Sequence, residues 1–153
     1  MSVAAARLPR AAQLTLAVQY AVSAKGKPSR AQFRKWVLAA LEHDAHITLR
    51  IVGKKEGRAL NLGYRNKDYA TNVLTFVLQD KAPFEGDLAL CAPVVEGEAH
   101  AQKKSVVAHY AHLTVHGVLH LQGYDHENDE DAQVMECRET QIMAKLGYAD
   151  PYR

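Results

Sequence analysis

Three histidines in one short segment constrain this chain more than any other feature of its sequence. His116 and His120 are four residues apart, and His126 follows after Gly123, which gives the pattern H-x-x-x-H-x-x-G-x-x-H. On a helix, an i, i+4 spacing places two imidazoles on one face, one turn apart. A glycine after the helix permits a sharp reversal, so the third imidazole can return to the same ion. The pattern predicts a three-histidine metal site at the end of a helix.

Three neutral imidazoles are a ligand set typical of zinc. They leave a fourth tetrahedral position for water, as in catalytic sites, whereas structural zinc usually has four protein ligands and favours cysteine. Neither Cys91 nor Cys137 is near these histidines in the sequence. We therefore expect one Zn²⁺ per chain, although nickel or copper would also accept three imidazoles.

The same spacing occurs in the metzincin peptidases, whose motif is H-E-x-x-H-x-x-G-x-x-H. Their glutamate is the general base of peptide hydrolysis, and this chain has Gly117 at that position. The sequence thus keeps the metal ligands and lacks the peptidase base. A metzincin-like metalloprotease with a different base remains an alternative.

The periodicity of apolar residues predicts an α+β fold. Alternating patterns predict strands at residues 14–20, 45–52, 72–78 and 86–91. Helical spacing and capping residues predict helices at residues 31–43, 54–64, 94–102, 105–122 and 129–146. In the first of these helices, Phe33, Val37, Leu38 and Leu41 form the expected apolar face. We expect a small mixed four-stranded sheet, with the zinc site at the end of a central helix.

Length and composition indicate one globular domain over residues 1–153, with residues 1–12 flexible. The chain is 48% hydrophobic and 24% charged, which is ordinary for a soluble domain and excludes a disordered or fibrous chain. No run approaches the roughly 20 apolar residues of a membrane span. Two cysteines are too few for a disulfide framework, so we expect the reducing cytoplasm.

Charge is distributed unevenly along the chain. Residues 1–70 contain 13 Lys and Arg and 4 Asp and Glu, a net charge of +9, and residues 71–153 contain 6 and 13, a net charge of −7. Such asymmetry indicates nucleic-acid contact by the basic half, or a solvated surface that happens to be sorted along the chain. Tyr64 and Tyr69 are candidates for stacking on bases, or for packing. The candidates for contact with RNA phosphates are Arg50, Lys54, Lys55, Arg58 and Lys67.

The segment VHGVLHLQGYDH, residues 115–126, resembles the signature of the YbeY family, bacterial zinc-dependent endoribonucleases of ribosomal RNA maturation. Residues 64–76 (YRNKDYATNVLTF) and 86–88 (GDL) resemble two further blocks of the family, and LGY with DPY near the C-terminus resembles its usual ending. The resemblance covers roughly residues 14–152. One departure is Val77, where the family commonly has proline.

The resemblance implies that His116, His120 and His126 bind zinc and that Arg65 is catalytic. It implies a single-strand-specific endoribonuclease that acts in ribosomal RNA processing, at the 3′ end of small-subunit RNA, and in ribosome quality control. The expected partners are single-stranded RNA and the small ribosomal subunit. A non-catalytic ribosome-associated assembly factor with structural zinc is the alternative from another class.

Three residues near the site have two interpretations each. Arg65 is expected in a loop, where it contacts RNA or pairs with Asp68 at the surface. His112, one turn before His116, supports a zinc ligand or is a core histidine with a satisfied hydrogen bond. Asp125 orients a ligating imidazole or caps the turn after Gly123. The sequence identifies no general base. The 2′-hydroxyl of RNA can itself be the nucleophile, in which case zinc need not deliver a water.

Overall fold

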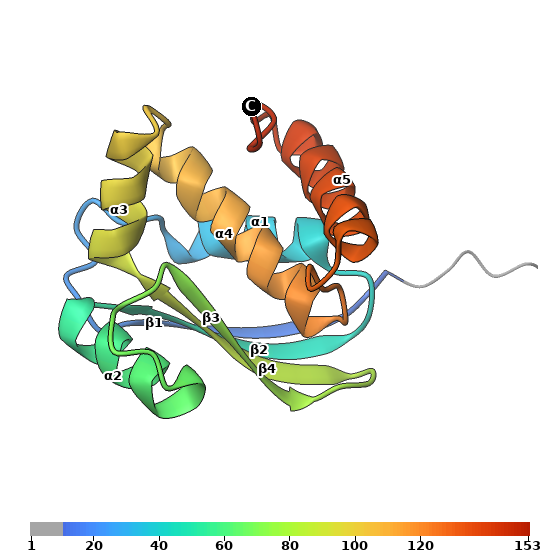
Figure 1. The fold of residues 1–153 in the computed structure, drawn as a ribbon. Coiled ribbons are helices and arrows are strands. Elements are labelled where there is room, and N and C mark those ends of the chain that lie inside the picture. Colours follow the sequence, from blue (N-terminus) through green and yellow to red (C-terminus); the bar gives the residue numbers. More distant parts are fainter. Residues whose placement is uncertain (1–10) are drawn as a thin grey trace, which may run out of the picture.

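The computed structural model describes residues 11–153, which form a four-stranded sheet and five helices (Figure 1). The α+β fold class predicted from the sequence is confirmed. No helix in these residues is long and apolar enough to cross a membrane. The predicted flexible segment 1–12 lies almost entirely outside the described residues. In chain order the elements are β1 (Leu14–Tyr20), α1 (Arg30–Ala40), β2 (Ala45–Val52), α2 (Lys54–Arg65), β3 (Val73–Gln79), β4 (Phe84–Cys91), α3 (Ala92–Ala101), α4 (Val106–Leu121) and α5 (Asp129–Lys145).

The sheet has the strand order β1-β2-β4-β3. β1, β2 and β4 are parallel, and β3 forms an antiparallel hairpin with β4 at one edge. Alternate residues of a strand point to opposite faces, and in β2 the residues Ile47, Leu49 and Ile51 are buried while His46 is exposed. The sheet therefore has one face in the core and one face largely open.

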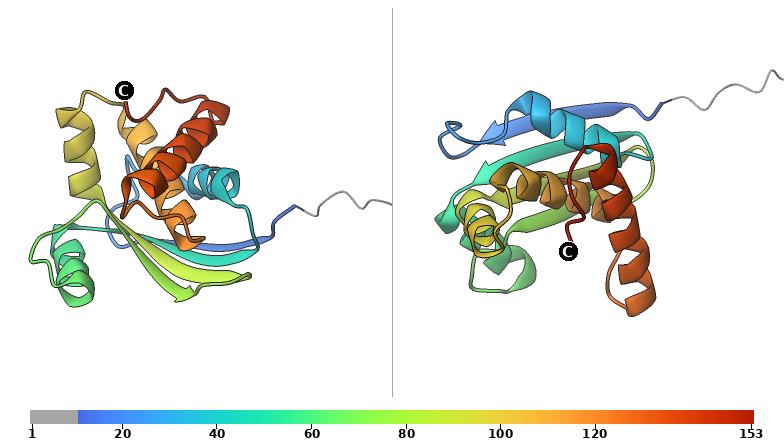
Figure 2. Two further views of the ribbon diagram at one scale, coloured as in Figure 1. Left: turned by 45° about the vertical axis from the view of Figure 1, so that its right-hand side comes forward. Right: turned by 90° about the horizontal axis from the view of Figure 1, so that it is seen from above.

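Helices α1, α3, α4 and α5 lie on the core face, and α4 contacts the other three as well as β3 and β4 (Figures 1 and 2). α2 lies on the other side of the sheet. Consecutive residues of β3 show this: the Thr75 hydroxyl is 3.5 Å from the backbone oxygen of Gly117 in α4, and the Phe76 ring is 4.4 Å from that of Tyr64 in α2. α2 and α4 thus contact opposite faces of the edge strand β3.

The ends of α4 follow from its sequence. The Ser105 hydroxyl caps the helix by accepting a hydrogen bond from the backbone N–H of Ala108. At the other end Gly123 adopts a φ of 103°, a left-handed conformation that glycine tolerates without strain. The N–H of Tyr124 then bonds back to the carbonyl of Leu119, and the chain reverses toward α5. The expected sharp turn after the second histidine is confirmed.

Helix α1 differs from its prediction at two points. Leu38 was expected on the buried face but is 42% exposed, while Trp36 is 2% exposed and packs edge-on against Phe33. The helix also ends at Ala40 rather than at residue 43. The reason is a tertiary contact: the side-chain oxygen of Gln122 accepts the backbone N–H groups that would otherwise continue the helix, those of Glu42 and His43.

Gly86 in β4 provides a test of the packing between the sheet and α4. A Cβ atom at this position would lie 2.6 Å from the backbone oxygen of Phe76 and 2.5 Å from a methyl group of Leu121. Because a backbone oxygen cannot move aside, we expect Gly86→Ala to lower the free energy of unfolding by about 1–3 kcal/mol. Gly97→Ala in α3, where nothing lies within 4 Å, is the control and should stabilise by about 0.5–1 kcal/mol. Denaturant melts that showed equal stability for both variants would contradict this packing.

Candidate active site

The three histidines of the motif converge at the end of α4. His116 and His120 lie on successive turns of the helix, and His126 lies in the turn before α5. The ring centroid of His126 is 5.4 Å from that of His116 and 6.2 Å from that of His120. The structure thus brings together the three residues that the sequence selected as metal ligands.

Hydrogen bonds orient two of these rings through their Nδ1 atoms. His116 Nδ1 is 3.1 Å from a carboxylate oxygen of Glu139, and His120 Nδ1 is 3.0 Å from the backbone oxygen of Tyr124. Since both acceptors carry no proton, each Nδ1 is the donor. This leaves Nε2 of both rings unprotonated and able to bind a metal, which is how proteins commonly orient ligating histidines.

The residues present fit a zinc ion with a small adjustment. Within the described residues, no group of three His, Cys, Asp or Glu side chains is already close enough to hold a metal. A tetrahedral zinc with Zn–N distances of about 2.0–2.1 Å places imidazole centroids about 5 Å apart. The His116–His126 separation of 5.4 Å meets this, and the His120–His126 separation of 6.2 Å exceeds it by about 1 Å. His126 is exposed in a turn, which leaves its ring room to rotate.

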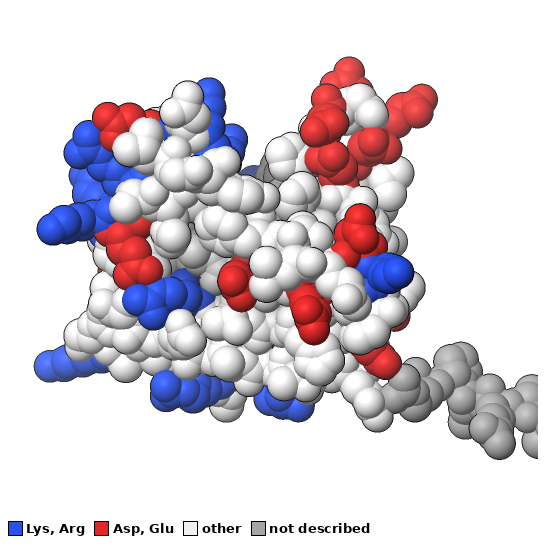
Figure 3. All heavy atoms as spheres, turned by 90° about the horizontal axis from the view of Figure 1, so that it is seen from below, with Lys and Arg blue, Asp and Glu red and all other residues white. Residues whose placement is uncertain are grey.

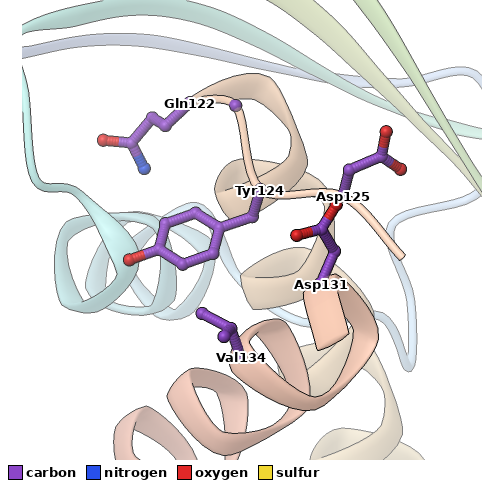
Figure 4. A pocket seen from close by; sticks show the side chains of 6 residues that line it. Gln122, Tyr124, Asp125, Asp131 and Val134 are labelled. Atoms are coloured by element: carbon purple, nitrogen blue, oxygen red, sulfur yellow. The ribbon is translucent and has the colours of Figure 1, made fainter. Parts of the chain in front are cut away.

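The turn that carries His126 is fixed by contacts with the end of α1. The side chain of Gln122 bonds the carbonyl of Ala40 as well as the two N–H groups beyond it, and the Tyr124 hydroxyl donates to the carboxylate of Glu42 (Figure 4). Both side chains point from the turn toward α1. The position of the third histidine therefore depends on an interaction between segments about 80 residues apart.

Of the two interpretations of Asp125, the structure contains the contact within the turn. Its carboxylate accepts a hydrogen bond of 2.7 Å from the backbone N–H of His126. It also lines a cavity of about 290 Å³ together with Asp131 (Figure 4). That cavity contains neither Arg65 nor any of the three histidines, so it is separate from the candidate active site.

Glu139 in α5 is the residue of this site that the sequence analysis missed. Its side chain is only 1% exposed and accepts hydrogen bonds from His116, from His112 Nε2 at 2.8 Å and from the Tyr152 hydroxyl at 2.8 Å. Burial alone would raise the pKa of Glu139, but the hydrogen bonds from His112 and His116 lower it to about 2. Glu139 is thus a buried carboxylate that holds a metal-ligand candidate in place.

His112 is placed behind His116 rather than beside the metal position. Its side chain is 12% exposed, and its Nε2 bonds the same oxygen of Glu139 that His116 contacts. Its Nδ1 is buried and has no hydrogen-bond partner among the described residues. The contact of His112 is therefore with the carboxylate that orients His116.

Arg65 lies in the last turn of α2 and not in a loop as expected. The helix ends because Asn66 adopts a left-handed conformation with a φ of 57°. Asp68, which the sequence offered as a surface partner for Arg65, pairs instead with Arg58, with 2.6 Å between Arg58 Nε and Asp68 Oδ1. Arg65 has no ion-pair partner within residues 11–153. Its guanidinium is therefore available to an anion.

One cavity of about 470 Å³ joins Arg65 to His116 and His126, while His120 does not line it. It is bounded by residues from α2 and β3 on one side and from α4, α5 and the C-terminal segment on the other. The lining residues are Arg65, Thr71, Asn72, Val73, His116, His126, Ala132, Met135, Glu136, Glu139 and Tyr152. The cavity thus combines the guanidinium of Arg65 with two imidazoles, and it also contains the carboxylates of Glu136 and Glu139.

The other predicted phosphate contacts lie outside this cavity. Lys54, Lys55 and Arg58 line a separate surface cavity on α2, Arg50 pairs with Glu56 at 2.6 Å, and Lys67 lies in the loop after α2. The pKa of Arg50 is raised by its hydrogen bond and charge pairing with Glu56. Seen from below, Lys and Arg gather over α2 on one side of a hollow, and Asp and Glu over the beginning of α5 on the other (Figure 3). Tyr64 and Tyr69 do not line the histidine cavity.

These features define a class of small α+β proteins with a histidine cluster and an arginine in one cavity. A family model described as "Endoribonuclease YbeY" matches residues 20–147. Proteins with that name from Nitrosospira multiformis and Nitrosomonas eutropha are both 59% identical to this chain, over 94% and 90% of it and 84% and 97% of their own lengths. The solution structure of TM1509 from Thermotoga maritima shares the fold, with a TM-score of 0.56 and 24% identity over 91% of this chain and 99% of its own. The chain belongs to the YbeY endoribonuclease family.

Proposed function

We propose that this protein is a zinc-dependent, single-strand-specific endoribonuclease that acts in ribosomal RNA processing, at the 3′ end of small-subunit RNA, and in ribosome quality control in the cytoplasm. The observation that carries the proposal is the cavity shared by Arg65, His116 and His126. The name of the relatives, Endoribonuclease YbeY, supports the same reaction.

His116, His120 and His126 would hold the zinc ion. When bound, zinc supplies a Lewis acid for a phosphoryl oxygen or for an attacking water. The protein's own contribution is to fix the rings: Glu139 orients His116, and the backbone oxygen of Tyr124 orients His120. A ligand set held in this way loses little entropy when the metal binds.

Arg65 would bind the scissile phosphate. Its guanidinium presents two parallel N–H donors that match two oxygens of a phosphodiester, and negative charge on those oxygens grows in the transition state. Because Arg65 has no ion pair to break within residues 11–153, its whole charge is available to the substrate. Arg65 therefore stabilises the transition state more than the bound RNA.

The size of the cavity supports a preference for unpaired RNA. A volume of about 470 Å³ lies in the range of pockets that enclose one small ligand. One unpaired nucleotide can enter such a pocket, whereas a paired nucleotide must first leave its helix, at a cost of a few kcal/mol.

The packing of Gly117 disfavours the metalloprotease alternative. A Cβ atom there would lie 2.6 Å from Cδ2 of Leu88, so the position faces the sheet and has no room for a longer side chain. The glutamate base of the metzincins does not fit at this place in the helix. A peptidase would need a base elsewhere in the cavity.

The proposal is tested by incubating protein of known zinc content with an end-labelled single-stranded RNA, with the same RNA in a duplex and with a generic peptide. We expect cleavage of the single strand, at least roughly 10-fold slower cleavage of the duplex and no cleavage of the peptide. Removing zinc with a chelator should stop the reaction, and adding zinc should restore it. Zinc-loaded protein that leaves single-stranded RNA intact would support the assembly factor instead, and peptide cleavage would support the protease.

A further inference from the structure

We propose that Tyr152 forms a nucleobase-stacking subsite in the histidine cavity, an inference that rests on the proposed function. Tyr152 is 46% exposed and lines the cavity together with Arg65, His116 and His126. When Arg65 binds a phosphate in this cavity, the neighbouring base can contact the Tyr152 ring. Aromatic rings that hold unpaired bases are common in proteins that bind single strands.

The ring of Tyr152 is held by a perpendicular ring contact and by its hydroxyl. The hydroxyl donates to Glu139 at 2.8 Å, and the His112 ring packs against the tyrosine ring at 5.2 Å with an interplanar angle of 84°. Nearly half of the residue's surface nevertheless remains exposed. A ring restrained in this way offers a stacking surface without losing further side-chain entropy on binding.

The backbone that carries Tyr152 is also anchored. Its N–H donates to the carboxylate of Asp150 at 2.9 Å. The carbonyl of the preceding residue, the buried Pro151, accepts a hydrogen bond from the ammonium group of Lys104. The C-terminal segment therefore presents the tyrosine at a fixed position against α4 and α5.

Two polar side chains of this cavity are already occupied by contacts within the protein. The Asn72 amide group donates to Glu98 and its oxygen accepts from the N–H of Val73, so its polar atoms are already paired. Glu139 already accepts three hydrogen bonds. Because Asn72 and Glu139 are already paired, we do not expect these two residues to read a base edge, and we expect a preference for purines over pyrimidines, set by the area of the stacked ring.

The test compares Tyr152→Phe, which keeps the ring, with Tyr152→Leu, which removes it. A single-stranded RNA made non-cleavable by 2′-O-methyl groups carries 2-aminopurine at one position, which is moved along the strand in successive oligonucleotides. We expect quenching of its fluorescence at one position by the natural protein and by Tyr152→Phe, and loss of this quenching in Tyr152→Leu. On cleavable RNA, Tyr152→Leu should raise KM by about 5- to 150-fold, with a smaller effect on kcat.

Each other result overturns one of the two proposals. If Tyr152→Phe and Tyr152→Leu lost quenching equally, Tyr152 would act only through its hydrogen bond to Glu139. If Tyr152→Leu kept the natural quenching and the natural KM, the ring would not be used. Either result overturns the subsite, as does the absence of quenching by the natural protein at every position. Quenching by a natural, zinc-loaded protein that cleaves no RNA would instead overturn the nuclease and leave the subsite standing. Circular dichroism spectra of the variants verify that they are folded.

Discussion

Replacing His120 with alanine should release the zinc ion and lower RNA cleavage on the order of 10³-fold or more, while the fold is retained. The two remaining imidazoles do not make up the ligand set of a zinc site. The fold should survive because the His120 side chain is only partly buried and its hydrogen bond goes to the turn, at the backbone oxygen of Tyr124. The measurements are zinc per chain, the cleavage rate and a thermal melt in excess chelator, where the natural protein and the variant should unfold within a few degrees of each other.

His46→Ala is the matched control for this prediction. His46 is exposed on the open face of β2, away from α4, so its loss should change neither zinc content nor cleavage. Stoichiometric zinc in His120→Ala would show that this histidine is not a ligand. Unchanged cleavage in a zinc-free variant would instead reveal a contaminating ribonuclease in the preparations.

The sequence predicted the elements of the fold well where the local pattern is strong. The strict alternation in residues 14–20 and 45–52 placed β1 and β2 with the bounds found in the structure. The predicted cap at Asn128 and the glycines after the two helices fixed the bounds of α4 and α5 to within a residue or two. These signals are local, because periodicity and caps depend only on neighbours in the chain.

The parts of the site that depend on tertiary contacts could not be predicted. Glu139 occupies the same helix face as the buried residues Met135, Ile142 and Met143, which signalled a buried carboxylate. The sequence did not show which side chains Glu139 would contact, because His112 and His116 are 27 and 23 residues away in the chain. For the same reason, sequence spacing could not tell which arginine pairs with Asp68. The partner is Arg58, ten residues before Asp68 in the chain, and not Arg65, three residues before it.

Arg65→Ala should lower kcat by about 10²- to 10³-fold, because it removes the cation that meets the charge developing on the phosphate. Arg65→Lys should recover only part of this loss, since an ammonium group cannot bond two phosphate oxygens in the parallel geometry of a guanidinium. KM should change much less than kcat if the contact strengthens in the transition state. Arg65 is exposed at the end of α2, so neither substitution should alter the melting temperature or the zinc content.

Arg34→Ala on α1 controls for the general loss of one positive charge. Arg34 is exposed and lines a different cavity, beside β1, so this variant should cleave RNA at the natural rate. A similar loss of kcat in Arg34→Ala would show that net charge and not position is responsible. If Arg65→Ala kept the natural kcat, Arg65 would have no part in the chemical step. The histidines would then be the protein's whole contribution to catalysis. Full recovery by Arg65→Lys would show that one positive charge suffices, because only the bidentate geometry distinguishes the two side chains at this site.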